Sequence, residues 1–325
     1  MSSIAPPRPA RAAEGAIQVT PTGGYFGAEI SGVDIGRPLA PETLAALQAA
    51  LARYEVIVFR NQDIDIDQLM AFGRAFGELS VHPFSFNRED KPEIMLLDNS
   101  ADNPPQLTDR WHTDETFRAE PPMGTILSAK VVPPHGGDTV FASMTAAYRG
   151  LSERMQRYIH GLEAVHDFKP FRLLFSDAPE ARRKLRELED QHPNPSHPVV
   201  RVHPITGRRI VFVNPQFTLR IKGISEEENE AILNLLYGLA RIPEYQLRVR
   251  WQPGTVVFWD NRSTQHYAPH DYYPHRRSME RVTICGEAVL GVEGEYTPEQ
   301  DGDEARWLKM RGNASKQFKH PSRLY

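Results

Sequence analysis

Two short motifs carry residue types that bind divalent metal ions. His112 and Asp114 are two positions apart in WHTDETF, and His266 follows the apolar run TVVFWD in NRSTQHYA. Residues i and i+2 of an extended segment lie on one face, so this imidazole and this carboxylate can bind one ion. Two histidines and one carboxylate are the ligand set of non-haem Fe(II) oxygenases, which leaves coordination positions open. The motifs predict a metal centre, although isolated histidines of this kind are also common as hydrogen-bonded structural residues.

A third motif, HRRSMERVTI, adds two arginines that are four positions apart, Arg277 and Arg281. A guanidinium binds a carboxylate, sulfonate or phosphate through two parallel hydrogen bonds. Beside a metal centre, two arginines can therefore bind two different anions, a cosubstrate and a substrate. Without the metal centre, the same basic run would be a solvated surface segment.

Short strands dominate the elements that must position these residues. We expect helices at about 41–54, 65–77, 144–160, 177–190 and 225–241, where apolar residues follow a helical period. Turns with proline and glycine separate the expected strands, and no regular alternation of strands and helices predicts a doubly wound sheet. The pattern favours a jelly-roll sandwich with helices packed outside it. The strands are expected at 17–20, 55–60, 93–98, 123–132, 138–143, 198–203, 208–214, 246–251, 255–260 and 281–285.

Composition and charge limit the classes of protein and of partner. The formal net charge of −4 gives no basic surface for nucleic acid, and no run of 18 apolar residues predicts a membrane span. We therefore expect a cytoplasmic protein with no nucleic-acid or membrane partner. Cys285 is the single cysteine, so no internal disulfide is possible, and it is expected to be buried in the last strand. We divide the chain into a disordered leader at 1–14, one domain at 15–290 and a polar C-terminal tail at 291–325.

The ordered series of motifs resembles the taurine/2,4-dichlorophenoxyacetate dioxygenase family of Fe(II)- and 2-oxoglutarate-dependent enzymes, and most closely its taurine dioxygenase branch. The resemblance runs from about Ile17 to Glu287 and includes GAEISGVDI, NPPQLTDRWHTDETF, PPHGGDTVFAS, RWQPGTVVFWDNRSTQHYA and RRSMERVTICG. It implies a mainly β fold with flanking helices around a double-stranded β-helix (jelly-roll) core. It also implies that Fe(II), 2-oxoglutarate and O₂ are used to hydroxylate a small anionic organic substrate. We further expect a homo-oligomer, either a dimer or a tetramer.

The resemblance also implies a role for particular residues. His112, Asp114 and His266 would bind the iron. Arg277, assisted by the hydroxyl of Thr139, would pair with the distal carboxylate of 2-oxoglutarate. The remaining residues would form the substrate site: Arg281 and His82 would bind the anionic group, and Phe217 and Phe171 would form the wall, with core packing an equal alternative for Phe171.

Three positions depart from the taurine dioxygenase pattern. Ser85 and Thr108 stand where that branch has a tyrosine and an asparagine that recognise the taurine amine, and they stay candidate substrate-binding residues. Glu115 replaces a small apolar residue beside Asp114. The series of motifs favours a sulfonate such as taurine, which would release sulfite and an aldehyde in sulfur metabolism. The departures favour the same chemistry on an alkyl sulfate or an aryloxyalkanoate. A more remote alternative is a jelly-roll metal-binding protein without oxygenase activity, or a zinc hydrolase on the same ligands.

Overall fold

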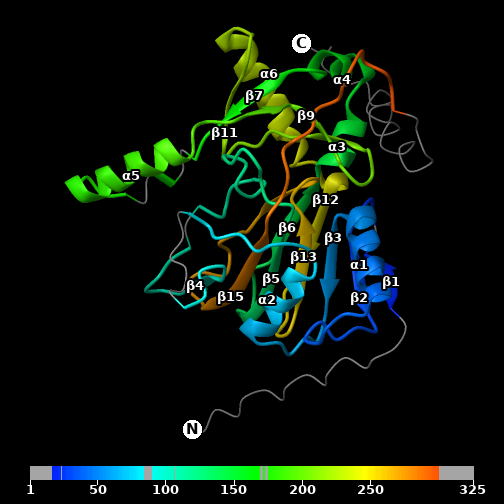
Figure 1. Ribbon diagram of the computed structural model, residues 1–325, viewed down its shortest axis with the longest axis vertical. Coiled ribbons are helices and arrows are strands. Elements are labelled where there is room, and N and C mark those ends of the chain that lie inside the picture. Colours follow the sequence, from blue (N-terminus) through cyan, green and yellow to red (C-terminus); the bar gives the residue numbers. More distant parts are fainter. Residues whose placement is uncertain are drawn as a thin grey trace, which may run out of the picture.

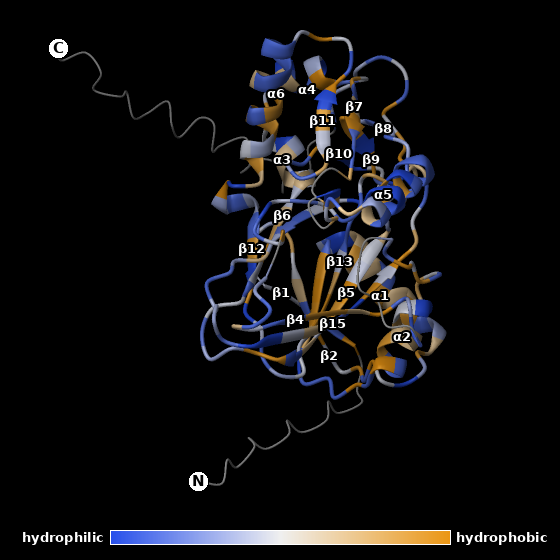
Figure 2. Ribbon diagram, turned by 90° about the vertical axis from the view of Figure 1, so that its left-hand side faces the viewer, coloured by the Kyte–Doolittle hydropathy of each residue, from blue (hydrophilic) through white to orange (hydrophobic). Residues whose placement is uncertain are grey.

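A seven-stranded sheet forms the centre of the molecule, here a computed structural model that describes residues 17–22, 24–83, 90–105, 107–168, 171–172 and 175–299 (Figure 1). All neighbouring strands in it are antiparallel except the parallel pair β2 and β3. Figure 2 shows that apolar residues are concentrated along its central strands, as burial on both faces requires. The strand order is β1 (Gln18–Pro21), β2 (Ala28–Ser31), β3 (Val56–Phe59), β13 (Val256–Asp260), β5 (Gly124–Val131), β15 (Arg277–Ile284) and β4 (Met95–Asn99).

A smaller sheet packs against one face of this large sheet. Its order is β12 (Gln246–Val249), β6 (Thr139–Ser143) and β14 (Thr264–Tyr267). Phe141 of β6 contacts Trp259 of β13, with ring centroids 5.4 Å apart, and both side chains belong to one buried apolar core. The two sheets form a jelly-roll core, which confirms the predicted fold class, mainly β with flanking helices.

Two helices cover the other face of the large sheet. Helix α1 (Pro41–Tyr54) packs on β3 and β13, and α2 (Ile66–Arg74) packs on β15. Helix α2 begins with a capping box, in which the Asp65 carboxylate accepts from Gln68 N and the Gln68 side chain accepts from Asp65 N. The helix predicted at 41–54 is confirmed, whereas the one predicted at 65–77 ends at Arg74.

Most of the remaining elements lie at the end of the molecule away from α2, at the top of Figure 1, and one helix extends from the side. The helix predicted at 144–160 is two helices, because the chain is extended at Leu151 and Ser152, and the Ser152 hydroxyl caps the second one. Helix α5 (Pro179–Gln191) projects away from the two sheets. The other elements are α3 (Met144–Gly150), α4 (Glu153–Ile159), α6 (Glu226–Leu239), the 3₁₀ helix η2 (Pro243–Tyr245), and two small sheets, β11 (Thr218–Ile221) with β7 (Glu163–His166) and β8 (Ser196–Pro198), and β10 (Arg209–Val211) with β9 (Val200–Val202).

Two strands that carry functional residues differ from the prediction. Strand β14 has the polar sequence TQHY, which no apolar pattern marks, and it is held by pairing with β6. Strand β15 begins at Arg277 rather than at Arg281, so both arginines lie on it. Because they are four positions apart on one strand, they project from the same face. The strand ends at Ile284, so Cys285 is exposed, and the expectation that it is buried is wrong.

The part of the predicted tail that the structure describes, residues 291–299, contacts the domain. Glu299 forms an ion pair with Arg149 at 3.2 Å, and the Tyr296 hydroxyl donates to Gln156 Oε1 at 3.0 Å. The predicted leader and residues 300–325 lie outside the described residues, so the division of the chain stays a prediction. None of the helices in the described ranges is both long and apolar enough to cross a lipid bilayer.

Candidate metal centre and its cavity

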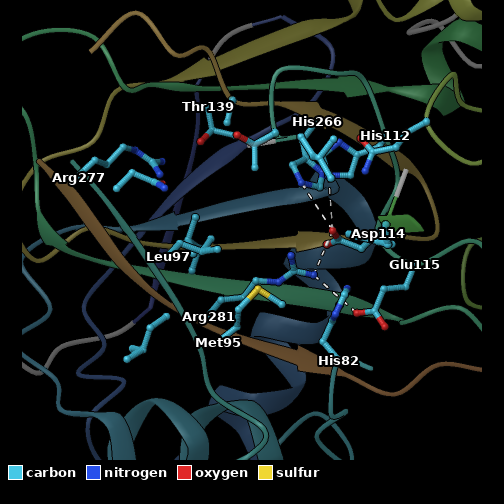
Figure 3. A pocket seen from close by; sticks show the side chains of 18 of the residues that line it. His82, Met95, Leu97, His112, Asp114, Glu115, Thr139, His266, Arg277 and Arg281 are labelled. Atoms are coloured by element: carbon cyan, nitrogen blue, oxygen red, sulfur yellow. Dashed lines mark ion pairs between the residues drawn. The ribbon is translucent and has the colours of Figure 1, made fainter. Parts of the chain in front are cut away.

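Backbone pairing between two distant segments brings His112 and His266 together. Strand β14 positions His266, and an isolated bridge joins this residue to His112 through hydrogen bonds of 3.1 Å and 2.8 Å. The two rings lie 4.1 Å apart between centroids. Asp114 follows two positions later, and its carboxylate points back at both rings (Figure 3).

The three side chains present one ligand atom each to a common point. The Asp114 Oδ1 atom lies 3.8 Å from the Nε2 atom of His112 and 3.8 Å from the Nε2 atom of His266. All three atoms lie within 4.8 Å of one another, and each residue is at most 7% exposed. The Nδ1 atom of His112 lies 2.7 Å from the carbonyl oxygen of Arg110, which directs Nε2 towards the other ligands. Among the described residues, this is the group of histidines and carboxylates whose geometry suits a metal ion.

A chain of hydrogen bonds behind Asp114 fixes its carboxylate. The Thr125 hydroxyl donates to Asp114 Oδ2 at 2.7 Å and accepts from Asn261 Nδ2 at 2.9 Å. The Trp259 indole then donates to Asn261 Oδ1 at 2.9 Å. Such partners orient a metal ligand and tune its basicity. The motifs did not indicate Thr125 or Asn261, because the two residues meet beside Asp114 only through the pairing of β5 with β13.

The electrostatics of the group suit a cation. Burial lowers the pKa of His112 and lowers that of His266 further, so both imidazoles are neutral and keep a lone pair for a metal. Burial alone would raise the pKa of Asp114, but the positive charge of Arg281 and the hydrogen bond from the Thr125 hydroxyl act in the opposite direction, and the pKa is lowered. Two neutral nitrogens and one carboxylate are the facial ligand set that Fe(II) takes in non-haem oxygenases. The residues present therefore suit Fe(II).

The metal ligands line a cavity of about 340 Å³ (Figure 3). Charged and polar groups lie at two separate places in it. Thr139 and Arg277 lie at one end, whereas Arg281, Glu115 and His82 lie together beyond Asp114. Much of the rest of the lining is apolar, namely Met95, Leu96, Leu97, Leu127, Phe171, Phe217 and Trp259.

Arg277 offers a buried guanidinium with free donor capacity. Its side chain Nε donates to the carbonyl oxygen of Gly137 at 3.0 Å, and its Nη2 has no hydrogen-bond partner in the described part of the chain. Burial lowers the pKa of Arg277 to about 10. The Thr139 hydroxyl accepts from the Trp251 indole at 3.0 Å, so its own proton is available. A carboxylate ligand at this end of the cavity would accept hydrogen bonds from the Arg277 guanidinium and the Thr139 hydroxyl. The cosubstrate 2-oxoglutarate carries such a carboxylate.

Arg281 lies directly beside the metal ligands. Its Nη2 is 3.1 Å from Asp114 Oδ1 and 3.9 Å from Glu115 Oε1, and its Nε donates to the Thr283 hydroxyl at 3.2 Å. His82 is buried on the same side, and burial lowers its pKa. The structure thus brings Arg281 and His82 together at the cavity.

The other residues proposed for substrate binding divide into three outcomes. Phe171 and Phe217 both line the cavity, 5.8 Å apart between ring centroids. Thr108 also lines it, and its hydroxyl lies 2.9 Å from His270 Nε2, which limits its freedom to bind a ligand. Ser85 lies outside the described residues.

Comparisons with known proteins point to one family of enzymes. The sequence profile of the taurine catabolism dioxygenase TauD, TfdA family matches residues 18–283. The chain is 37% identical to an alpha-ketoglutarate-dependent sulfate ester dioxygenase of Pseudomonas putida, over 86% of this chain and 93% of that protein. It is 33% identical to an alkylsulfatase of Acinetobacter baylyi, over 86% and 88% of the two chains. A solved structure of a taurine dioxygenase from Burkholderia xenovorans covers 90% of this chain and 98% of its own, with a TM-score of 0.74 and 34% identity.

Proposed function

The chain belongs to the TauD/TfdA dioxygenase family, and from this premise we propose that it hydroxylates a sulfate ester of a small organic alcohol. The chain is a 2-oxoglutarate-dependent dioxygenase that uses Fe(II) and O₂ and acts on a small anionic substrate, as the sequence predicted. When bound, Fe(II) activates O₂ with the electrons that the oxidative decarboxylation of 2-oxoglutarate to succinate and CO₂ supplies.

We assign the metal to His112, Asp114 and His266. The Arg110 carbonyl and the Thr125 hydroxyl hold two of these ligands in fixed orientations. This arrangement leaves one side of the ligand set open towards the cavity, where cosubstrate and substrate must meet. Pre-organised ligands of this kind reduce the reorganisation that the reaction requires.

We assign the distal carboxylate of 2-oxoglutarate to Arg277 and Thr139. The supporting observation is that both carry unused donor capacity at one end of the cavity. A carboxylate there would convert a buried, unpaired guanidinium into a hydrogen-bonded ion pair.

We assign the anionic group of the substrate to Arg281 and His82. The single observation that carries this proposal is the Arg281 guanidinium, which lies beside the metal ligands in a cavity with a largely apolar lining. An anion bound there would place its carbon chain on the side chains of Leu97, Phe171 and Phe217. Hydroxylation of the carbon that bears the sulfate gives a product that collapses to an aldehyde and sulfate, with loss of a proton. Fixing that carbon against the open side of the metal is the contribution of the protein.

A sulfate ester is favoured over taurine by three observations. The relative with 37% identity is a sulfate ester dioxygenase, and the cavity wall is apolar where a carbon chain would lie. Thr108, in place of an asparagine, is already bonded to His270. A sulfonate, which the motifs favoured, is the second candidate because the solved taurine dioxygenase is 34% identical. An aryloxyalkanoate would place its ring on the same wall.

The test compares matched substrates with the purified protein, Fe(II) and 2-oxoglutarate. Hexyl sulfate, hexanesulfonate and phenoxyacetate are each assayed for succinate, together with sulfate, sulfite and phenol respectively. We expect stoichiometric sulfate and succinate from hexyl sulfate. If no sulfate is released from hexyl sulfate, efficient release of sulfite would identify a sulfonate as the substrate class. Efficient release of phenol would identify an aryloxyalkanoate.

Two further expectations stay proposals. We propose that the protein is cytoplasmic and that it forms a dimer or a tetramer. Cell fractionation tests the first, and light scattering on the purified protein tests the second. A monomer at micromolar concentration would contradict the assembly.

A further inference from the structure

Glu115 places a carboxylate in the wall of the cavity, directly after the metal ligand Asp114. Its side chain is 2% exposed. Its φ of 48° lies in the left-handed region, which a residue other than glycine adopts at a cost. The Arg118 amide closes the turn by donating to the Glu115 carbonyl at 3.0 Å. A buried charge on a strained backbone requires compensating interactions.

The two carboxylate oxygens of Glu115 have different surroundings. Oε2 accepts from Arg118 Nε at 2.6 Å, and Arg118 is itself anchored by donation to the carbonyl oxygen of Val81 at 2.8 Å. Oε1 is buried and has no hydrogen-bond partner within the described ranges. The Nη2 atom of Arg281 lies 3.9 Å from Oε1, which is beyond hydrogen-bond distance. A buried acceptor without a donor is destabilising, so Oε1 lacks the partner that its burial requires.

This oxygen lies beside the guanidinium to which we assign the anionic group of the substrate. Figure 3 shows the Glu115 carboxylate beside the Arg281 guanidinium and next to His82. An anion bound by Arg281 would therefore lie close to a second negative charge, which disfavours binding. A hydrogen-bond donor of the substrate that lies between the bound anion and the Glu115 carboxylate would reduce the repulsion between the two negative charges. The same donor would satisfy Oε1.

We propose that Glu115 Oε1 accepts a hydrogen bond from a hydroxyl or ammonium group of the substrate. The inference rests on the proposed function, because Arg281 must hold the anionic group for the donor to reach Oε1. The substrate class is then an organosulfur anion that carries an O–H or N–H donor close to its sulfur-bearing group. Glu115 acts as a specificity-determining residue, and Arg118 holds it in position.

A purely structural role for Glu115 makes a different prediction. An ion pair that only holds Arg118 uses Oε2 and leaves the substrate unaffected. Its loss would lower stability and the turnover of all substrates alike, whereas recognition of a donor changes the ratio between matched substrates. The quantity to measure is therefore the ratio of kcat/KM between matched substrates with and without the donor.

The experiment uses butyl sulfate, 2-hydroxybutyl sulfate and 2-aminobutyl sulfate on the enzyme with Fe(II) and 2-oxoglutarate. The kcat/KM for succinate formation and the Kd without O₂ are measured for the wild type, Glu115→Leu and Glu115→Gln. Glu120→Gln is the matched control, because Glu120 is exposed on the same segment and does not line the cavity. Thermal melting checks that each variant is folded.

In the wild type and the control, the donor-bearing esters are expected to exceed butyl sulfate by about tenfold to a hundredfold, the effect of one hydrogen bond to a charged group. In Glu115→Leu, the ratio should approach one. In Glu115→Gln, the amide oxygen still accepts but carries no charge, so the preference for the hydroxyl should persist and that for the ammonium should fall. If Glu115→Leu does not fold, Glu115→Gln still tests the inference. In this variant the kcat/KM for 2-aminobutyl sulfate should fall relative to that for 2-hydroxybutyl sulfate.

Two results would overturn the inference alone: equal use of all three esters by the wild type, or an unchanged ratio in the folded Glu115→Leu variant. A different result would overturn the proposed function as well. This is the absence of substrate-dependent succinate with every ester and with the matching sulfonates.

Discussion

Replacement of Arg277 by methionine should weaken the binding of 2-oxoglutarate without destabilising the cosubstrate-free protein. The guanidinium is 5% exposed and packs near the rings of Trp251 and Tyr272, at 5.8 Å and 5.7 Å from their centroids. Its Nη2 has no hydrogen-bond partner in the described ranges, so part of the cost of burying its charge is left for a ligand to offset. Methionine keeps much of the apolar contact and removes the charge.

The magnitudes follow from these contacts. Burial lowers the pKa of Arg277 from 12.5 to about 10, which corresponds to a cost of about 3 kcal/mol for the charged form. Methionine removes that cost but loses the hydrogen bond to Gly137, which contributes about 1 kcal/mol. The free energy of unfolding without 2-oxoglutarate should therefore not decrease. Losing the charge pair with the bound cosubstrate should cost about 2–5 kcal/mol, or roughly a 30-fold to several-thousand-fold rise in Kd.

Calorimetric titration of the Fe(II)-loaded proteins with 2-oxoglutarate under anaerobic conditions measures this Kd. Thermal unfolding with and without 2-oxoglutarate measures the stability. The matched control is Arg276→Met, because Arg276 is exposed and pairs with Asp98 at 2.8 Å outside the cavity. An unchanged Kd in Arg277→Met, or an equal loss in Arg276→Met, would refute the assignment of Arg277.

Three further predictions concern other ionisable side chains. Asp114→Ala removes the one carboxylate of the metal ligands and should abolish both iron binding and succinate formation; full activity in a metal and succinate assay would contradict the site. Arg281→Ala should raise the KM for the organosulfur anion while the Kd for 2-oxoglutarate stays unchanged, and a defect in the cosubstrate alone would mean that the two arginines have exchanged roles. Burial raises the pKa of Glu55 from 4.5 to about 7, so the folded protein binds this proton more tightly than the unfolded chain does. The free energy of unfolding therefore decreases as the pH rises from 4.5 to about 7. Glu55→Gln should therefore gain stability relative to wild type between about pH 5 and about pH 8, by at most about 3 kcal/mol in urea unfolding, whereas a pH-independent difference would contradict this account.

Much of the chemistry of this protein could be predicted from the sequence because it is carried by short segments. The spacing of His112 and Asp114 sets their relation within one extended stretch, whereas the strand that carries both Arg277 and Arg281 was predicted only from Arg281 onwards. The regular apolar period of residues 41–54 and the apolar runs of β3 and β13 are likewise local properties. These patterns reflect backbone geometry over a few residues, which the sequence states directly.

Other features depend on contacts between residues far apart in the chain. His266 reaches His112 only because the polar strand β14 pairs with β6 and bridges to the segment of His112. Thr125 and Asn261 support Asp114 because β5 and β13 are neighbours in the large sheet. Cys285 is exposed because β15 ends one residue before it, although the predicted strand at 281–285 included it.

The sequence by itself determined which groups could bind a metal ion and two anions, because residue type and local spacing are sufficient for that. It did not determine the surroundings of Glu115. Only the tertiary structure places one oxygen of this carboxylate on Arg118 and leaves the other in the cavity near Arg281, across 166 positions of sequence from 115 to 281. The hydrogen bonding and desolvation of a buried polar group depend on which distant segments pack around it, and no local pattern contains that information.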